Sequence, residues 1–223
     1  MKVPTKADNG KSAGRPRSRN ALATRASILE AGIEEFCQHG LSGASTARIV
    51  ERAQCNIRML YHYFESKELL YRAAIEHVYE KLRASEIELN IAGRDPVEGI
   101  RALTAFTYDY MAANPEFIHM VAAENLMKGA FIREIESIPR SSRPLIESIR
   151  GLLRKGEASG VFRSDVDPVQ LYISIVSLSF IHISSRYTLS VTFGVDLSNP
   201  DLVAQRRQHV IELIMTYLRP PAN

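Results

Sequence analysis

Four Asp-Pro or Asn-Pro pairs in the second half of the chain constrain its fold more than any other feature. An Asp or Asn side chain accepts a free backbone N–H at a helix N-cap, and proline occupies the first helical position without losing a hydrogen bond. Each pair therefore predicts the start of a helix. The pairs begin at Asp95, Asn114, Asp167 and Asn199, and the helices predicted from them cover about residues 95–113, 115–127, 168–189 and 200–218.

Apolar residues elsewhere recur with the spacing of a helix, and no segment alternates with the period of a strand. One apolar stripe runs from Ile28 to Phe36, and another follows Ser66, which can cap a helix. The sequence therefore predicts an all-α protein. The remaining predicted helices cover about residues 21–38, 45–52, 56–63, 66–91 and 141–159, with a short or broken helix within 128–138.

Positive charge is concentrated at the N-terminus. Residues 1–25 carry seven basic side chains and one acid, whereas the whole chain has a net charge of only +3, so the rest of the chain is mildly acidic. A basic arm on an acidic body favours polyanionic partners. We expect residues 1–20 to form a disordered basic arm, although a solvated tail without a partner would have the same composition.

The sequence lacks the motifs that are typical of enzymes and of metal-binding proteins. The chain has no nucleophile elbow, phosphate-binding glycine loop or Cys/His cluster, and its six histidines share no metal-ligand spacing. We therefore expect no enzyme, no metal site and no cofactor. Cys37 and Cys55 are too few for a disulfide framework and predict buried thiols in a reducing cytoplasm. No signal peptide is visible, and the uncharged stretch 168–185 is too short for a membrane span and predicts a buried helix.

Two short predicted helices stand close together near residue 50. Ser45 can cap the first, which ends near Arg52, and Asn56 can cap the second after a turn of three residues. Two short helices joined in this way form the helix-turn-helix pattern, whose second helix enters the major groove of DNA. The residues expected to point inward, against Ile33 and Phe36 of the preceding helix, are Ile49, Ala53, Cys55, Leu60 and Phe64.

The second short helix carries more rings and polar groups than one core can use. Tyrosine hydroxyls, a histidine ring and an ammonium group can contact phosphates and fix the register of a protein on DNA. Arginine can read guanine O6 and N7, and apolar side chains can contact a thymine methyl group. The expected phosphate contacts are Tyr61, His62, Tyr63 and Lys67, and the expected base contacts are Ile57, Arg58 and Met59, with Arg48 reaching the same groove. Half-buried packing is the alternative for the two tyrosines, and a core position is the alternative for Ile57.

These residues resemble the N-terminal domain of the TetR/AcrR family of bacterial transcription regulators. The resemblance covers about residues 22–70 and is most specific in the Tyr-His-Tyr-Phe-x-Ser-Lys core, Tyr61–Lys67. It implies a helix-turn-helix domain over residues 21–66 that binds a palindromic operator, and a helical effector-binding and dimerisation domain over residues 67–223. By position it adds Ser45 and Thr46 to the phosphate contacts and supports Tyr61, Tyr63, Lys67, Ile57, Arg58 and Met59.

Two positions depart from the pattern of this family. Gln54 stands in the turn where the family usually has glycine, so it has to tolerate a left-handed backbone. Asn56 replaces the usual serine and is an equivalent cap. Ahead of this domain, Arg15 and Arg17 lie in a short basic segment that could enter an A·T-rich minor groove or act as an electrostatic tether.

The second domain should hold a small-molecule pocket that is mostly apolar with a few polar groups. Each polar candidate has an alternative, because a histidine can be a hydrogen-bonded core residue and charged residues can lie at the surface. The charge of the ligand stays open. The expected walls are Phe106, Tyr110, Phe117, Met120, Phe180 and Tyr187, and the expected polar groups are Glu124, Asn125, His182 and Arg186.

The last two predicted helices are more apolar than surface helices need to be, and they include Leu171–Ile183. They form either intramolecular core or a subunit interface, in which two helices from each chain make a four-helix bundle. The predicted function is a cytoplasmic, ligand-responsive transcription regulator, a homodimeric repressor that a small effector releases from its double-stranded DNA operator. The alternative is an architectural or replication-linked DNA-binding protein without an effector.

Overall fold

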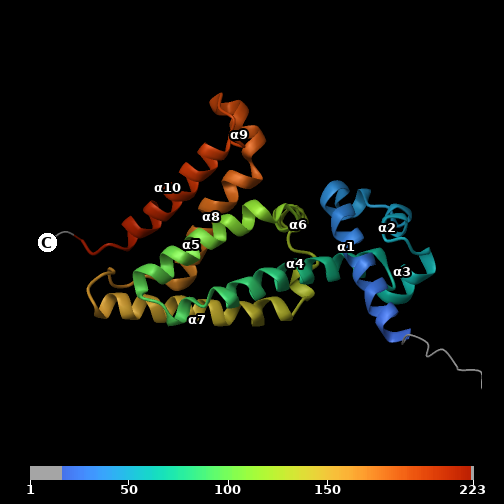
Figure 1. Ribbon diagram of the computed structural model, residues 1–223, viewed down its shortest axis with the longest axis horizontal. Helices are drawn as coiled ribbons and strands as arrows, with labels where there is room; N and C mark the ends of the chain where they lie inside the picture. The colour runs from blue at the N-terminus through green and yellow to red at the C-terminus, as the bar shows by residue number, and fades with distance from the viewer. Residues whose placement is uncertain (1–16, 222–223) are drawn as a thin grey trace, which may run out of the picture.

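The computed structural model describes residues 17–221 of the chain, and side chains from residue 21 onward. Within that part the backbone forms ten α-helices and two short 3-10 segments, and no strand. The predicted all-α fold class is therefore confirmed. Figure 1 shows three N-terminal helices at one end of the long helix α4, and the remaining helices along and beyond the rest of it.

The N-terminal unit consists of α1 (Arg17–Gly43), α2 (Thr46–Arg52) and α3 (Ile57–Phe64). Helix α1 begins earlier than predicted, so residues 17–20 of the expected arm have a helical backbone. Near its other end, Gly40 adopts φ 62° and ψ 177°, which bends the last turn toward α2. Arg15 lies outside the described residues, and so does the side chain of Arg17.

Helix α4 (Lys67–Leu89) belongs to the cores of both parts of the molecule. Its start is as predicted, because Ser66 Oγ accepts the N–H of Leu69 at 3.0 Å. The ring of Tyr71 meets the ring of Phe36 on α1 edge-on, with centroids 5.0 Å apart. One apolar cluster continues from α1–α3 through α4 to Met120, so the hydrophobic core crosses the expected boundary at residue 67.

The second part contains η1 (Ile91–Gly93), α5 (Pro96–Ala113), α6 (Pro115–Leu126), η2 (Ile132–Glu134), α7 (Ser137–Ala158), α8 (Pro168–Ser184), α9 (Arg186–Phe193) and α10 (Pro200–Leu218). Three of the four predicted caps form, since the side chains of Asp95, Asp167 and Asn199 accept backbone N–H groups. Asn114 does not cap α6, because its Nδ2 donates to the carbonyl of Tyr110 at 2.7 Å.

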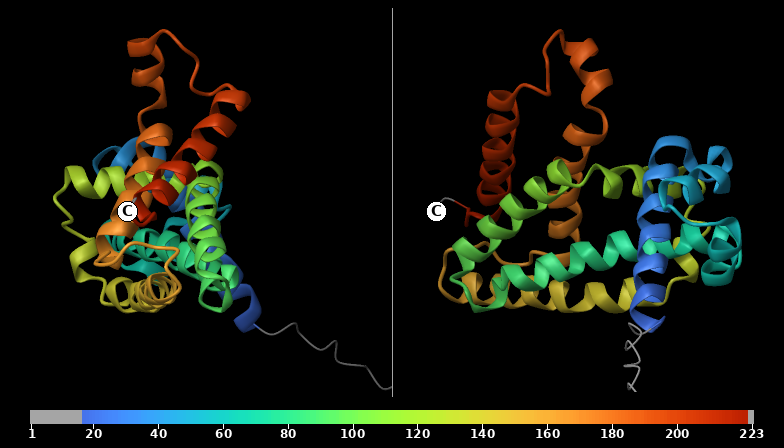
Figure 2. Two further views of the ribbon diagram at one scale, coloured as in Figure 1. Left: turned by 90° about the vertical axis from the view of Figure 1, so that its left-hand side faces the viewer. Right: turned by 45° about the vertical axis from the view of Figure 1, so that its right-hand side comes forward.

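The single helix predicted over residues 168–189 is wrong. Two helices, α8 and α9, occupy this stretch and meet at an angle of 73°, because Ser185 leaves the helical conformation at φ −114° and ψ 12°. Figure 2 shows α9 standing away from the body at the tip of α8 and α10. Among the described residues no single helix is long and apolar enough to cross a membrane, although this bent pair reaches the required length and composition.

Below that tip, α8 and α10 pack with α5 and α7 around a second apolar cluster that includes Ile100, Ile149, Ile175 and Ile214. The two cysteines are half-buried free thiols instead of fully buried ones. Burial raises the pKa of Cys37 to about 12, so its thiol stays protonated at neutral pH.

Candidate DNA-binding surface and effector cavity

Helix α3 presents one buried and one outward face. Leu60 and Phe64 are buried against α1, which confirms the predicted inward register. Asn56 Oδ1 accepts the N–H of Met59 at 3.1 Å, and this cap fixes the start of the helix. On the outward face Tyr61 is 47% exposed. Ile57, Arg58 and His62 are also exposed, and Met59 and Tyr63 are half-buried.

The turn before α3 and the start of α4 hold this face in position. Gln54 has φ 51°, so the left-handed backbone expected at this position is present. Lys67 Nζ donates to the carbonyl of Ala44 at 3.2 Å, which ties the first residue of α4 to the loop before α2. Ser45 and Thr46 are half-buried at the start of α2. The predicted phosphate-contacting positions on three elements therefore share one end of the molecule (Figure 1).

The N-terminus of α2 is capped by a glutamate of α1, and the predicted Ser45 side-chain cap is wrong. Glu35 is fully buried, and its Oε1 accepts the backbone N–H of Ser45 at 2.9 Å and Nε of Arg48 at 2.8 Å. Its Oε2 lies 3.5 Å from Nη1 of Arg52. Burial alone would raise the pKa of Glu35, but the hydrogen bonds from Arg48 and Ser45 and the charges of Arg48 and His39 outweigh it and lower the pKa.

This arrangement gives Arg48 a structural role. Its guanidinium group binds Glu35 and donates to the carbonyl of Gly43 at 2.9 Å, so it orients α2 on α1. The side chain is still 47% exposed, and its contact with DNA stays a prediction. Sequence reasoning missed Glu35, although a signal was present. The residue lies seven positions after Ile28, on the inward side of the apolar stripe, where a carboxylate needs partners.

The predicted pocket walls are mostly core residues of the second part. Tyr110, Phe117 and Met120 are buried in the cluster shared with α1 and α4, and Phe106 and Phe180 pack against it. Glu124 is also buried, and its Oε2 accepts the N–H groups of Phe131 and Ile132 at 3.2 and 3.0 Å. In this structure these side chains pack in the core and Glu124 supports the loop after α6, and their role as ligand contacts stays a prediction.

Three further predicted ligand residues lie at the surface. Asn125 Nδ2 donates to the carbonyl of Val121 within its own helix. Arg186 Nη2 donates to the hydroxyl of Tyr187 at 3.1 Å, and this tyrosine is among the most exposed apolar side chains of the described part. Asn125 and Tyr187 are exposed and Arg186 is half-buried, and their role as ligand contacts stays a prediction.

His182 is a buried, hydrogen-bonded histidine, which was the alternative to a ligand contact. Its Nδ1 lies 2.6 Å from the hydroxyl of Tyr108. Burial and the charges of Arg206 and Arg186 lower the pKa of His182, so the ring is neutral at pH 7. It borders a groove of about 580 Å³ between α8, α9 and α10, together with Arg206 and His209.

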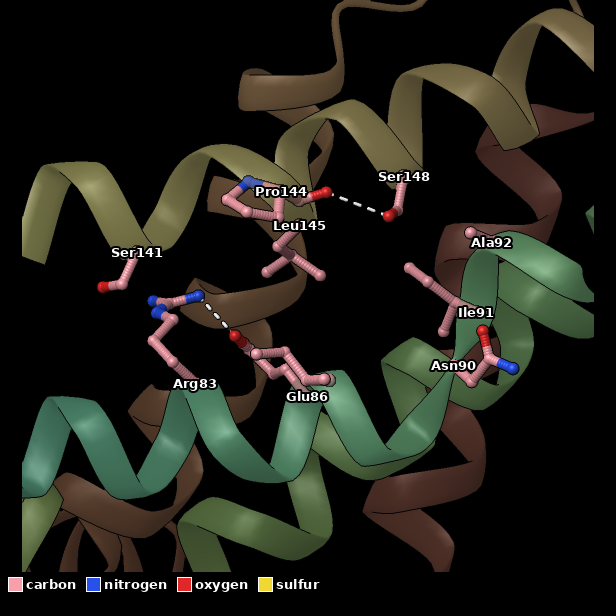
Figure 3. Close-up of a pocket in the computed structure, with 10 residues that line it drawn as sticks. Arg83, Glu86, Asn90, Ile91, Ala92, Ser141, Pro144, Leu145 and Ser148 are labelled. Atoms are coloured by element: carbon pink, nitrogen blue, oxygen red, sulfur yellow. Dashed lines mark hydrogen bonds and ion pairs between the residues drawn. The ribbon is translucent and has the colours of Figure 1, made fainter.

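A second cavity, of about 220 Å³, lies between α4, η1 and α7. Figure 3 shows Arg83 and Glu86 reaching into it from α4, opposite Ser141, Pro144, Leu145 and Ser148 of α7. Arg83 Nη1 donates to Glu86 Oε2, and Glu86 Oε1 accepts the hydroxyl of Tyr172 on α8 at 2.7 Å. Sequence reasoning missed this charged pair, although Glu86 lies one helical turn after Leu82, an apolar residue of the helix predicted to follow Ser66.

The side chains of α8 and α10 that face away from the second core include several large apolar groups. Ile173 and Ile181 on α8 and Leu213 and Tyr217 on α10 are exposed. Exposed apolar side chains gathered on neighbouring helices are typical of an interaction surface.

The geometry defines a helix-turn-helix DNA-binding protein with a larger helical second domain. Residues 28–74 match the family model of bacterial regulatory proteins of the tetR family, and residues 96–214 match the model of the tetracyclin repressor-like C-terminal domain. The chain belongs to the TetR family of bacterial transcription regulators, and it is a regulator, not an enzyme.

Two curated relatives are transcriptional repressors. The chain is 34% identical to the HTH-type transcriptional repressor NicS of Pseudomonas putida over 203 residues, which cover 91% of this chain and 96% of the relative. It is 27% identical to the HTH-type transcriptional repressor SCO4008 of Streptomyces coelicolor, over 73% of this chain and 79% of the relative.

Solved structures support the fold. The putative transcriptional regulator SCO4942 from Streptomyces coelicolor superposes with a TM-score of 0.64 at 23% identity, covering 89% of this chain and 99% of that one. The transcriptional regulator FadR from Bacillus subtilis, solved in complex with stearoyl-CoA, gives a TM-score of 0.65 at 17% identity over 87% and 99% of the two chains.

Proposed function

We propose that this regulator is a repressor that binds a palindromic operator as a homodimer and releases it when a small molecule binds the second domain. The observation that carries the proposal is the outward face of α3, where cationic, hydroxyl and apolar side chains stand exposed on a helix fixed by its buried face. Such a repressor acts on DNA in the cytoplasm.

In the proposed complex the N-terminal part of α3 lies in the major groove. Arg58 reads a guanine, and Ile57 and Met59 make apolar contacts with base edges. The phosphates are contacted by groups on three elements, which fix the register without reading the sequence. These groups are Ser45, Thr46, Tyr61, His62, Tyr63 and Lys67, with Asn56 capping the helix.

Two copies of the chain provide the symmetry of a palindrome. The exposed apolar side chains of α8 and α10 support a twofold contact in which the helices of both copies pack together. Half-sites one turn apart on DNA require recognition helices about 34–36 Å apart. A dimer whose helices are spaced differently loses contacts at both half-sites.

Helix α4 supports a direct route for this change of spacing. It is a single helix that begins at Lys67, which is hydrogen-bonded to the loop before α2, and its last turns carry Glu86 and Ile87, which line the cavity. A ligand that favours another position of α4 moves the helix-turn-helix unit with it. Each base pair that loses its fit costs about 1–3 kcal/mol, so a mismatch at both half-sites is enough for release.

The test begins with selection of bound sequences from a random DNA pool, followed by affinity measurements on variants of the selected site. We expect Arg58→Ala to relax the preference at one base position and Tyr61→Phe to weaken binding to all sequences alike. Tyr187→Phe, which alters an exposed tyrosine on α9, is the control and should bind as the wild type does. If Arg58→Ala and Tyr61→Phe give the same profile across operator variants, the assigned roles are wrong.

Dimerisation is tested separately by the molar mass in solution. Ile181→Asp and Leu213→Asp should shift the protein toward the monomer and weaken operator binding, because they place a charge in the proposed contact. Leu126→Asp is the control, since Leu126 is an exposed leucine on α6 and belongs to neither α8 nor α10. A wild-type protein that is monomeric at the concentrations where it binds DNA would contradict the proposal.

A further inference from the structure

The cavity between α4 and α7 contains a buried arginine whose donors are only partly used. Arg83 is 8% exposed, and all its hydrogen bonds in the described part of the chain leave from one nitrogen, Nη1, to Glu86 and to the hydroxyl of Tyr172 at 3.5 Å. Nε is buried and has no hydrogen-bond partner. A buried donor without a partner costs about 1–3 kcal/mol and is rare in folded proteins.

The unused edge of this guanidinium group has a defined geometry. Nε and Nη2 point their N–H groups in parallel, and this fork matches the two oxygens of a carboxylate. Glu86 and Tyr172 hold the opposite side of the group, which prevents Arg83 from turning away. In Figure 3 the guanidinium group extends from α4 toward Ser141 on α7, at one end of the cavity.

The hydroxyl groups of the cavity do not replace this donor pair, and Asn90, the other neutral polar side chain of the lining, lies at the opposite end from Arg83 (Figure 3). Ser141 Oγ donates to the carbonyl of Ile138 at 3.1 Å, and Ser148 Oγ donates to the carbonyl of Pro144 at 2.9 Å, so both hydroxyl protons are in use. Glu86 is the only acid that lines the cavity. The described walls therefore call for a ligand that supplies acceptor atoms to the free edge of Arg83.

We propose that this cavity is the effector site and that it binds a small monocarboxylate, with the carboxylate on the free edge of Arg83. The inference rests on the proposed function, because it names the ligand class of that regulator. The apolar part of the ligand packs on Ile91, Pro144 and Leu145. A cavity of about 220 Å³ holds a molecule on the order of ten non-hydrogen atoms.

A carboxylate suits the site better than a phosphate group. One guanidinium edge offers two donors, and its single charge is already shared with Glu86, whereas a phosphate brings up to two charges and three acceptor oxygens. Burial raises the pKa of Glu86 despite the opposing effects of Arg83 and Tyr172, so a proton on Glu86 can balance the incoming charge. Tyr110 on α5 is a further titratable group near this pair, and α7 contributes no titratable side chain to the cavity, only two hydroxyl groups and apolar groups.

The experiment uses the full-length protein and small probes of matched shape. Thermal stability is measured without DNA in the presence of benzoate, cyclohexanecarboxylate, the amides of both acids, or inorganic phosphate. We expect at least one of the two carboxylates to raise the melting temperature and its amide to have a much smaller effect. The same carboxylate should weaken binding to the selected operator.

Variants of Arg83 identify the site. Arg83→Gln should bind the active carboxylate about 10- to 100-fold more weakly, as expected for loss of charged hydrogen bonds, and Arg83→Lys should retain part of the affinity. Arg101→Gln, which changes an exposed arginine on α5, is the control. If Arg83→Gln fails to fold, Ser141→Trp tests the site by filling the space beside Arg83 while the arginine stays in place.

The outcomes separate this inference from the proposed function. A carboxylate effect that persists in Arg83→Gln or Ser141→Trp overturns the inference, and so does a response to phosphate without a response to either carboxylate. No response to any probe, with normal operator binding, also overturns the inference and leaves the repressor function standing. Failure of the wild type to bind any selected DNA would instead refute the proposed function.

Discussion

Replacing Glu35 with glutamine tests how the helix-turn-helix unit is held together. The substitution keeps the shape of the side chain. It replaces the charged oxygen that accepts two hydrogen bonds from Arg48 with a neutral amide oxygen. Hydrogen bonds to charged groups contribute about 1.5–3 kcal/mol and neutral ones about 0.5–1.5, so each bond loses about 1 kcal/mol. The new amide NH₂ group also faces Arg52, which lies 3.5 Å from Oε2, whereas water can replace part of the contact with half-exposed Arg48.

The expected cost of Glu35→Gln is therefore about 2–3 kcal/mol in the free energy of unfolding. In urea this lowers the unfolding midpoint by about 1 M at an m-value of about 2–3 kcal/mol/M. Glu34→Gln is the matched control, because Glu34 is 59% exposed and pairs with Arg52 at 3.0 Å, and it should cost less than about 1 kcal/mol. Equal midpoints for the two variants would refute the role assigned to Glu35.

The pH dependence of the same variant has a definite sign. The pKa of Glu35 is lower in the folded protein than its ordinary value of 4.5, so the ionised carboxylate stabilises the fold above that value. This stabilisation is lost as the pH falls through the folded pKa. The difference in unfolding free energy between the wild type and Glu35→Gln should therefore be constant near neutral pH and shrink below about pH 4.5.

Three further substitutions test local features, each by thermal or urea unfolding. Gln54→Gly should stabilise the protein by about 0.5–1 kcal/mol, because φ 51° strains any residue with a Cβ; a lower stability would contradict this. Gly156→Ala should destabilise by about 1–3 kcal/mol, because the added Cβ overlaps the ring of Phe162, and an unchanged midpoint would show that this loop gives way. Tyr108→Phe should cost about 1–2 kcal/mol, because the buried ring of His182 loses its hydrogen bond, and no change would mean that water replaces the hydroxyl.

The helices could be predicted where a local rule sets their ends. Asp95, Asp167 and Asn199 cap their helices as predicted, because an N-cap involves only residues within one turn of each other. The family resemblance around Tyr61 was equally local, since the helix-turn-helix motif is contained in one short segment. The break at Ser185 was not predictable, because its neighbours have no proline or glycine to mark it.

The residues of the candidate sites differ in the same way: a local pattern predicted some of them, and tertiary packing decides the environment of the others. The outward side chains of α3 followed from the amphipathic pattern of eight residues, which leaves one face for the core and one for a partner. The predicted ligand residues were chosen for their chemistry alone, and the structure places most of them in the core or at the surface. Their environment depends on contacts between helices that are far apart in the chain. A pattern within one segment cannot predict such contacts.

From the amino-acid sequence alone follow the helical class, most helix starts, the position of the recognition helix and the family. Tertiary packing was needed to show that Glu35 joins α1 to α2 and engages Arg48, and that Arg83 borders a cavity with an unused donor edge. The physical reason is the distance along the chain over which each interaction acts. Caps and amphipathic faces are set within a few residues, whereas the partners of a buried charge come from whichever elements the fold brings around it.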